Sequence, residues 1–343
     1  MSILRRLPRA RLLLMAALVA AGTLGGLASA QQTGAPATTP ATPPGQTLKL
    51  LTPRPMVPGA TVVTLWPEGS PKLRAAPGYD QPEVFSTPRN QPDHANSITN
   101  IHNPSIELHL APAAMANGLA IILAAGGGNT TLNVGWEGTD LVPWFNNLGI
   151  SVFVERYRIQ PYSSATDALY DTQRSIKMIR AHAKEWGVDP KRVGIMGFSA
   201  GGEQAARVGM NFDLGKPDDP DVVEHESSRP DFVALIYAGW GRMTFTVPKN
   251  APPAFCTVAG IDDMSHATQT MDFVSAWLKA GVPAELHIYS HGGHANAMQP
   301  RNGIPFGTWQ NRFLDWANDQ GWLNATRKPV PASESKQAAR PQG

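Results

Sequence analysis

The chain has 343 residues, of which 42% are hydrophobic and 16% charged, and its formal net charge is +2. This length allows one large domain or two small ones, and the composition supports a sizeable core and excludes global disorder. Cys256 is the only cysteine, so no intrachain disulfide can form.

The first thirty residues are typical of a secretory signal peptide. Four arginines precede the apolar run LLLMAALVAAGTLGGL, which ends in ASA at Ala30. This pattern predicts cleavage after Ala30 and a periplasmic or secreted protein, with a membrane anchor as the alternative and the Sec and twin-arginine routes both open. Cleavage would remove four arginines and no acidic residue, which takes the formal charge from +2 to −2. No nucleic-acid partner is expected, and no membrane partner after cleavage.

Two segments of low complexity flank the central part of the chain. Residues 31–60 are rich in Pro, Thr, Gly and Ala, which indicates a flexible linker, and residues 325–343 are predicted to form a disordered tail. The folded domain is therefore expected over residues 61–324.

Within this domain, apolar strands alternate with helices. The sequence predicts strands over 105–110, 118–125, 150–157, 192–198, 231–239, 253–260 and 284–290, and helices over 165–187, from 200, near 267–280 and near 308–318. Such alternation predicts an α/β fold with a mostly parallel sheet that helices cover on both faces. The acidic stretch 211–230 is expected to be a surface loop, with a wall or lid of the active site as the alternative.

Ser199 is the candidate nucleophile. The segment GFSAGG follows the predicted strand RVGIM and precedes a helix of small residues. In a nucleophile elbow the serine sits in a strained turn between strand and helix, so the residues two before and two after it must be small. Gly197 and Gly201 meet this requirement, and a structural serine in a glycine-rich loop is the alternative.

A serine needs a base and an orienting carboxylate to become a good nucleophile. Asp262 and Asp263 follow one predicted strand, and His291 and His294 follow the next. The carboxyl ends of parallel strands share one edge of the sheet, so these groups can meet Ser199. We favour Asp262 because it leaves the strand first, and His294 because two glycines precede it; Asp263 stays open as the acid.

Donors for the oxyanion are expected on the segment AAGGGN, where glycines let backbone N–H groups approach a substrate. The candidates are Gly127, Gly128 and the N–H of Ala200, and a plain glycine turn is the alternative. A metal site formed by the Asp and His residues is the alternative, but it would leave the nucleophile elbow unexplained. No metal or other cofactor is therefore expected. Trp136 and Trp240, with Trp144, are candidates for binding a sugar, and core packing is an equal alternative.

The chain resembles α/β-hydrolase serine esterases of the acetyl xylan esterase type, near the dienelactone-hydrolase and feruloyl-esterase groups. The resemblance rests on stretches such as LWPEGSP, WEGTDLVPWFNNLGISVFVERYRI and AGVPAELHIYSHGGHA, spread over roughly residues 60 to 323. It implies an exported carboxylesterase with a triad of Ser199, Asp262 and His294 and with no cofactor.

The expected substrates are small acyl esters, acetyl above all, with acylated plant-wall saccharides among the candidates. A serine peptidase of the same fold and a catalytically inert hydrolase-fold binding protein are the alternatives. The oligomeric state is left open.

Overall fold

The computed structural model of the protein describes residues 48–241, 243–295, 297–298 and 305–323, all within one compact unit that begins at Thr39. The predicted signal peptide, residues 31–47 of the predicted linker and the predicted tail lie outside the described residues. Within the described ranges, no helix is both long enough and apolar enough to cross a membrane.

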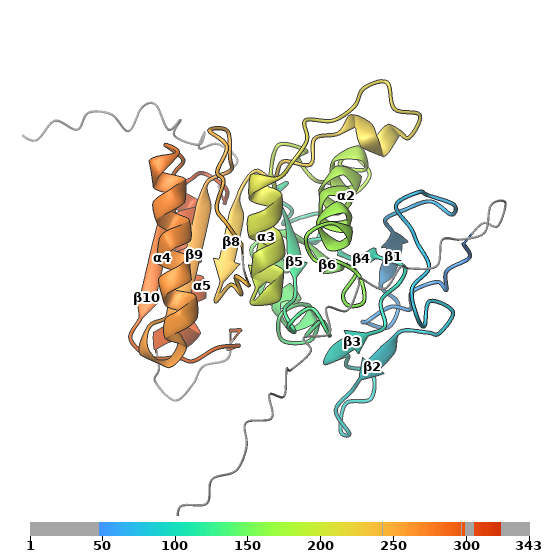
Figure 1. Ribbon diagram of the computed structural model, residues 1–343, viewed down its shortest axis with the longest axis horizontal. Coiled ribbons are helices and arrows are strands. Elements are labelled where there is room, and N and C mark those ends of the chain that lie inside the picture. Colours follow the sequence, from blue (N-terminus) through green and yellow to red (C-terminus); the bar gives the residue numbers. More distant parts are fainter. Residues whose placement is uncertain (1–47, 242, 296, 299–304, 324–343) are drawn as a thin grey trace, which may run out of the picture. The chain divides into compact units, whose positions relative to one another are not determined.

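An eight-stranded sheet forms the centre of the domain (Figure 1). In spatial order the strands are β1 (Thr61–Thr64), β4 (Ser105–His109), β6 (Ser151–Arg156), β5 (Ala120–Ala124), β7 (Val193–Phe198), β8 (Val233–Ile236), β9 (Ala254–Ala259) and β10 (Ala284–Tyr289). In this order the six strands that begin with β6 run parallel, whereas β4 is antiparallel to both of its neighbours. The predicted mostly parallel sheet is therefore confirmed.

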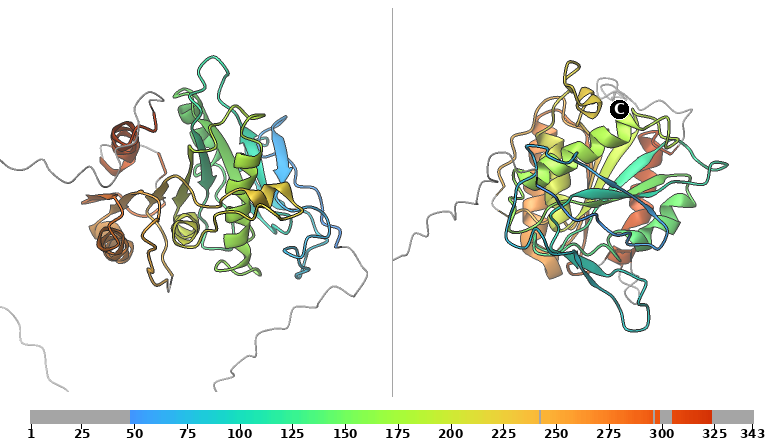
Figure 2. Two further views of the ribbon diagram at one scale, coloured as in Figure 1. Left: turned by 90° about the horizontal axis from the view of Figure 1, so that it is seen from above. Right: turned by 90° about the vertical axis from the view of Figure 1, so that its right-hand side faces the viewer.

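Helices cover both faces of this sheet. Figures 1 and 2 show α2 (Asp167–Ala181), α3 (Ala200–Met210) and α4 (Met264–Lys279) on one face and α5 (Trp309–Asp319) on the other. The short α1 (Val142–Asn146) shares the face of α5, because the rings of Phe145 and Phe313 meet with centroids 6.4 Å apart. A separate antiparallel pair, β2 (Val84–Ser86) and β3 (Ser97–Thr99), was not predicted, and neither were β1 and α1.

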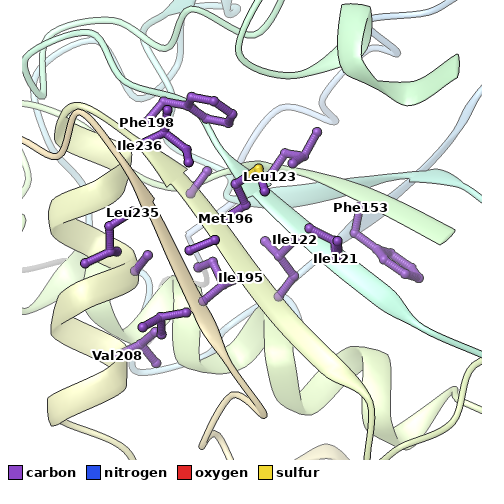
Figure 3. Packing of buried hydrophobic residues seen from close by; sticks show 14 of the residues in the cluster. Ile121, Ile122, Leu123, Phe153, Ile195, Met196, Phe198, Val208, Leu235 and Ile236 are labelled. Carbon is purple, nitrogen blue, oxygen red and sulfur yellow. The ribbon is translucent and has the colours of Figure 1, made fainter. Parts of the chain in front are cut away.

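The central strands are apolar along their whole length because both of their faces are covered. Every residue of β5, β7 and β8 is buried. Their side chains, among them Ile122, Leu123, Ile195 and Met196, interdigitate between the two helical layers (Figure 3). Complete burial of one such side chain stabilises the fold by about 1.5–3 kcal/mol, so this core fixes the positions of the strand ends.

Residues 48–60 differ from the predicted linker. Met56 is 3% exposed. Its backbone N–H donates to Glu107 Oε2 at 2.5 Å, and the N–H of Val57 donates to the other carboxylate oxygen at 3.1 Å. The carbonyl of Arg54 accepts a hydrogen bond from Arg156. This stretch is therefore tied to the antiparallel end of the sheet through a buried carboxylate that the composition of the segment did not reveal.

The 211–230 loop is anchored at the edge of the sheet opposite Ser199. Asp231, just after the loop, pairs with Val193, the first residue of β7, whereas Ser199 follows the last residue of that strand. The loop contains the short 3₁₀ helix η2 (Val222–His225) and lies over α2 (Figure 1). The prediction of a surface loop fits this position, and the alternative of an active-site lid does not.

Candidate active site

Ser199 lies at a sharp turn between β7 and α3. Its backbone dihedrals, φ 49° and ψ −119°, fall in a region that residues with a side chain rarely adopt. The glycines on either side allow the turn, because a Cβ on Gly197 would overlap the carbonyl of Gly201 and one on Gly201 would overlap the carbonyl of Ala124. The strand, turn and helix expected of a nucleophile elbow are therefore all present.

The ring of His294, in the loop after β10, links Ser199 to an acid. Its Nε2 lies 2.8 Å from Ser199 Oγ, and its Nδ1 lies 2.8 Å from Asp263 Oδ2. The His294 side chain is 32% exposed, whereas that of Asp263 is 7% exposed. A hydroxyl, an imidazole and a carboxylate from three strand ends thus form one continuous hydrogen-bonded chain.

The structure corrects the preference for Asp262 as the acid. Both aspartates belong to the 3₁₀ turn η3 (Ile261–Asp263), in which consecutive side chains point about 120° apart, so only one of them can face His294. Asp262 instead accepts a hydrogen bond from the backbone N–H of Gly292 at 2.9 Å and lies 3.3 Å from His291 Nδ1. Asp262 thus holds the start of the loop after β10 that carries His291 and His294, called the histidine loop below, and it does not contact the imidazole of His294.

Asp263 is held in its ionised form. Burial opposes the charge, but hydrogen bonds with His266 and His294 outweigh it and lower the pKa of the carboxyl to about 2. An ionised carboxylate at Nδ1 keeps the ring proton on that nitrogen, so Nε2 presents a lone pair to the serine hydroxyl.

Residues 126–128, which follow β5 and are called the glycine loop below, lie directly beside Ser199. A Cβ on Gly126 would overlap both the Ser199 Cβ and the carbonyl of Phe198. Gly127 and Gly128 have φ values of +132° and +63°, which glycine adopts readily. Among the described residues, no hydrogen bond uses the backbone N–H of Gly127, Gly128 or Ala200. These three predicted donors therefore have no protein partner within the part of the chain that the structure describes.

Two further buried residues, Glu137 and Tyr237, hold the glycine loop in place, and the sequence analysis did not identify them. The buried Glu137 accepts the N–H of Gly126 through Oε2 at 2.8 Å and the hydroxyl of Tyr237 through Oε1 at 2.9 Å. Burial raises the pKa of Glu137, although both hydrogen bonds oppose the increase. Tyr237 Oη also accepts the N–H of Ala297, in the histidine loop. A lone Glu before a glycine and a Tyr at a strand end carry no pattern that would have revealed this contact.

The predicted sugar-binding tryptophans fall into two environments. Trp240 is 1% exposed, donates to Thr270 Oγ1 and packs against Phe245 and Phe273. Its prediction as a substrate-binding residue is therefore wrong, because core side chains enclose its ring. Trp136 lies in the sequence between the glycine loop and Glu137. This residue is 44% exposed, so its ring is accessible to a ligand.

Comparisons with known proteins agree with this geometry. Residues 106–273 match the BD-FAE family. The chain is 27% identical over 255 residues to an acetylxylan esterase of Xylanibacter ruminicola, covering 65% of this chain and 48% of that protein. It is 26% identical over 202 residues to endo-1,4-beta-xylanase B of Butyrivibrio fibrisolvens, covering 50% of this chain and 32% of that protein. The chain thus spans about half of the first relative and a third of the second.

Solved structures share the fold. The acetyl ester-xyloside bifunctional hydrolase of Caldicellulosiruptor lactoaceticus superimposes with a TM-score of 0.64 at 27% identity, over 78% of this chain and 98% of that one. The butyrate-bound esterase Est2 of Thermogutta terrifontis superimposes with a TM-score of 0.52 at 19% identity, over 65% of this chain and 91% of that one. The second likeness concerns the fold alone.

The sheet and the elbow define an α/β-hydrolase fold, and the relatives that share it are esterases. Within that class, the chain is similar to the BD-FAE family over residues 106–273 and to esterases of the acetylxylan esterase type. The predicted fold, enzyme class and family resemblance are thereby confirmed.

Proposed function

We propose that Ser199 is the nucleophile, His294 the general base and Asp263 the residue that orients His294. The observation that carries this proposal is the unbroken chain of two 2.8 Å hydrogen bonds from Ser199 Oγ through both ring nitrogens of His294 to Asp263. The ionised Asp263 also stabilises the imidazolium that forms when His294 takes the serine proton.

The reaction proceeds through an acyl-enzyme. His294 Nε2 takes the proton of Ser199 as Oγ attacks the ester carbonyl carbon, and the carbonyl electron pair moves to the oxygen, which the N–H groups of Gly127, Gly128 and Ala200 stabilise. The tetrahedral intermediate collapses, and the leaving alcohol takes the proton from His294. Water then loses a proton to Nε2 and attacks the acyl carbon to form a second tetrahedral intermediate. Its bond to Ser199 Oγ breaks, Oγ takes the proton back from Nε2, and the acid is released.

The substrates we propose are small acyl esters, acetyl above all, carried by plant-wall saccharides such as xylan. Support comes from the names of two relatives, an acetylxylan esterase and an acetyl ester-xyloside hydrolase. The exposed ring of Trp136 supplies a flat apolar face of the kind on which sugars stack. We further propose that the protein is exported, on the pattern of its first thirty residues.

The test is a panel of esters of increasing acyl length, including acetylated xylo-oligosaccharides, given to the wild type and to Ser199→Ala. We expect acetyl release by the wild type and a loss of about 10⁴-fold or more in Ser199→Ala. Ser265→Ala, which removes an exposed hydroxyl two residues after Asp263, is the matched control and should keep its rate.

A fluorophosphonate probe separates the alternatives. Labelling of the wild type but not of Ser199→Ala supports the proposed nucleophile. Folded wild type that neither reacts with the probe nor cleaves any ester would make the chain an inert binding protein. Cleavage of an aminoacyl amide without cleavage of the matching ester would make it a peptidase.

A further inference from the structure

A second imidazole, that of His266, contacts Asp263, the proposed triad acid. His266, in the first turn of α4, places Nδ1 2.5 Å from Asp263 Oδ1, while His294 Nδ1 contacts the other carboxylate oxygen at 2.8 Å. The two imidazole rings stack with centroids 4.4 Å apart and planes 23° from parallel. The carboxylate of Asp263 therefore bridges two stacked histidines, each of which presents its Nδ1 atom to one carboxylate oxygen. A triad requires only one of these contacts.

These three side chains form a compact set of nitrogen and oxygen ligands. One ligand atom from each of them lies within 4.8 Å of the others. Imidazole nitrogen and carboxylate oxygen are ligands that Zn²⁺ accepts at about 2.0–2.2 Å, which spaces tetrahedral ligand atoms about 3.3 Å apart. Zn²⁺ binding requires the two Nδ1 atoms to move about 0.5–0.8 Å away from the Asp263 oxygens, and the rings to turn out of their stacked arrangement so that the ion lies in the plane of each. The histidine side chains are 29% and 32% exposed, which leaves room for this movement. Water can supply the remaining ligand.

We propose that Asp263, His266 and His294 form an inhibitory site for a divalent transition metal, with Zn²⁺ as the fitting ion. The inference rests on the proposed function in one respect only, since inhibition requires that His294 be the base. Binding of the metal itself does not depend on catalysis.

The tautomer of His294 explains why a bound ion would inhibit the enzyme. A neutral imidazole carries one ring proton, which the ionised Asp263 holds on Nδ1 in the absence of metal. When Nδ1 binds the metal, this proton moves to Nε2, with no net release. Nε2 then donates a hydrogen bond to Ser199 Oγ and has no lone pair with which to take the serine proton. Activity should return when a chelator removes the ion.

Calorimetric titration of Zn²⁺ into the full chain tests binding separately from catalysis. Ser199→Ala keeps all three ligands, so we expect it to bind one Zn²⁺ with the affinity of the wild type. His266→Gln should weaken binding, and raise the Zn²⁺ concentration for half-inhibition, by at least about tenfold. Inhibition is measured on p-nitrophenyl acetate against each variant's own metal-free rate. His266→Phe keeps a flat ring against His294 but no ligand, and should behave like His266→Gln.

His291→Gln is the matched control. His291 contacts the neighbouring Asp262 and is 62% exposed, so it is the obvious competing histidine on the same loop. Unchanged Zn²⁺ binding and inhibition in His291→Gln support the proposal. Equal binding and inhibition in the wild type and both His266 variants would overturn it, as would loss of inhibition in His291→Gln. If the wild type cleaves no ester yet binds Zn²⁺ through His266, the proposed function fails and the metal site stands.

Discussion

The hydroxyl of Tyr237 lies 2.9 Å from Glu137 Oε1, and this contact joins the two loops that complete the candidate active site. On one side, Glu137 holds the N–H of Gly126 in the glycine loop. On the other side, Tyr237 Oη accepts the N–H of Ala297 in the histidine loop, and its ring meets that of His294 edge-on with centroids 5.2 Å apart. Tyr237 has a φ of +40°, so the surrounding packing holds it in a strained backbone conformation at the end of β8.

Tyr237→Phe should therefore reduce catalysis more than stability. The variant keeps the ring but leaves Glu137 Oε1 and the Ala297 N–H without their shared partner. We expect kcat to fall about 10- to 100-fold with little change in KM, since both loops lose their relative position. The free energy of unfolding should fall by about 1–3 kcal/mol. Steady-state kinetics and urea unfolding measure the two effects.

Tyr162→Phe is the control for this prediction. Tyr162 is also buried, and its hydroxyl contacts His102 and the carbonyl of Arg74, away from both loops. It should lose stability to a similar degree while keeping kcat. If Tyr237→Phe likewise lost only stability, the contact with Glu137 would have no part in positioning the site.

The two neighbouring aspartates should respond very differently to the same substitution. Asp263→Asn removes the charge that fixes the His294 tautomer, and we expect kcat to fall by about 10⁴-fold. Asp262→Asn changes a side chain that is 38% exposed and contacts only the start of the loop, so its kcat should fall less than about tenfold. Rates on p-nitrophenyl acetate decide between them. Equal losses would mean that the triad acid is not set by the contact with His294.

This contrast marks the limit of prediction from sequence. The alternation of apolar strands with helices along the chain, together with the GFSAGG turn, was enough to predict the sheet and the elbow. It also predicted the edge of the sheet at which Ser199 and His294 meet. The acid was not predictable, because a 3₁₀ turn decides which of two adjacent carboxylates faces the ring. Trp240 was misjudged because burial of its ring depends on Phe245 and Phe273, which only the fold brings together. Glu137 and Tyr237 are a hundred residues apart, and no local pattern links them.

Glu224→Gln should lower stability without changing catalysis. Glu224 forms ion pairs with Arg174 Nη1 and Lys177 Nζ, both at 2.7 Å. These pairs hold the 211–230 loop against α2. Both cations are 3% exposed, and each keeps a second acidic partner in Asp221 or Asp213. We therefore expect a loss of about 2–3 kcal/mol in unfolding free energy, below the full cost of breaking a buried pair.

The exposed Asp218→Asn on the same loop is the control and should stay within about 0.5 kcal/mol of the wild type. KM and acyl-length preference should be the same in both variants and the wild type, since the loop lies at the edge away from Ser199. A changed acyl preference in Glu224→Gln would restore the lid interpretation.

Glu155 should make the stability of the protein depend on pH. This residue of β6 is fully buried, and burial raises the pKa of its carboxyl from 4.5 to about 8, although the hydroxyls of Ser175 and Thr172 partly offset the effect. Between these values the folded protein keeps a proton that the unfolded chain releases. Stability from this group is therefore greatest below pH 4.5 and is lost as the pH rises toward 8, by up to about 1.4 kcal/mol per pH unit.

Glu155→Gln removes this titration and keeps a neutral side chain of the same shape. Urea unfolding of both proteins from pH 5 to 8 isolates the effect, because contributions from all other groups cancel in the difference between them. We expect the wild type to lose stability relative to Glu155→Gln steadily across this range. A difference that stays constant with pH would mean that Glu155 is already ionised in the folded protein at pH 5, and that the hydroxyls of Ser175 and Thr172 stabilise its charge despite burial.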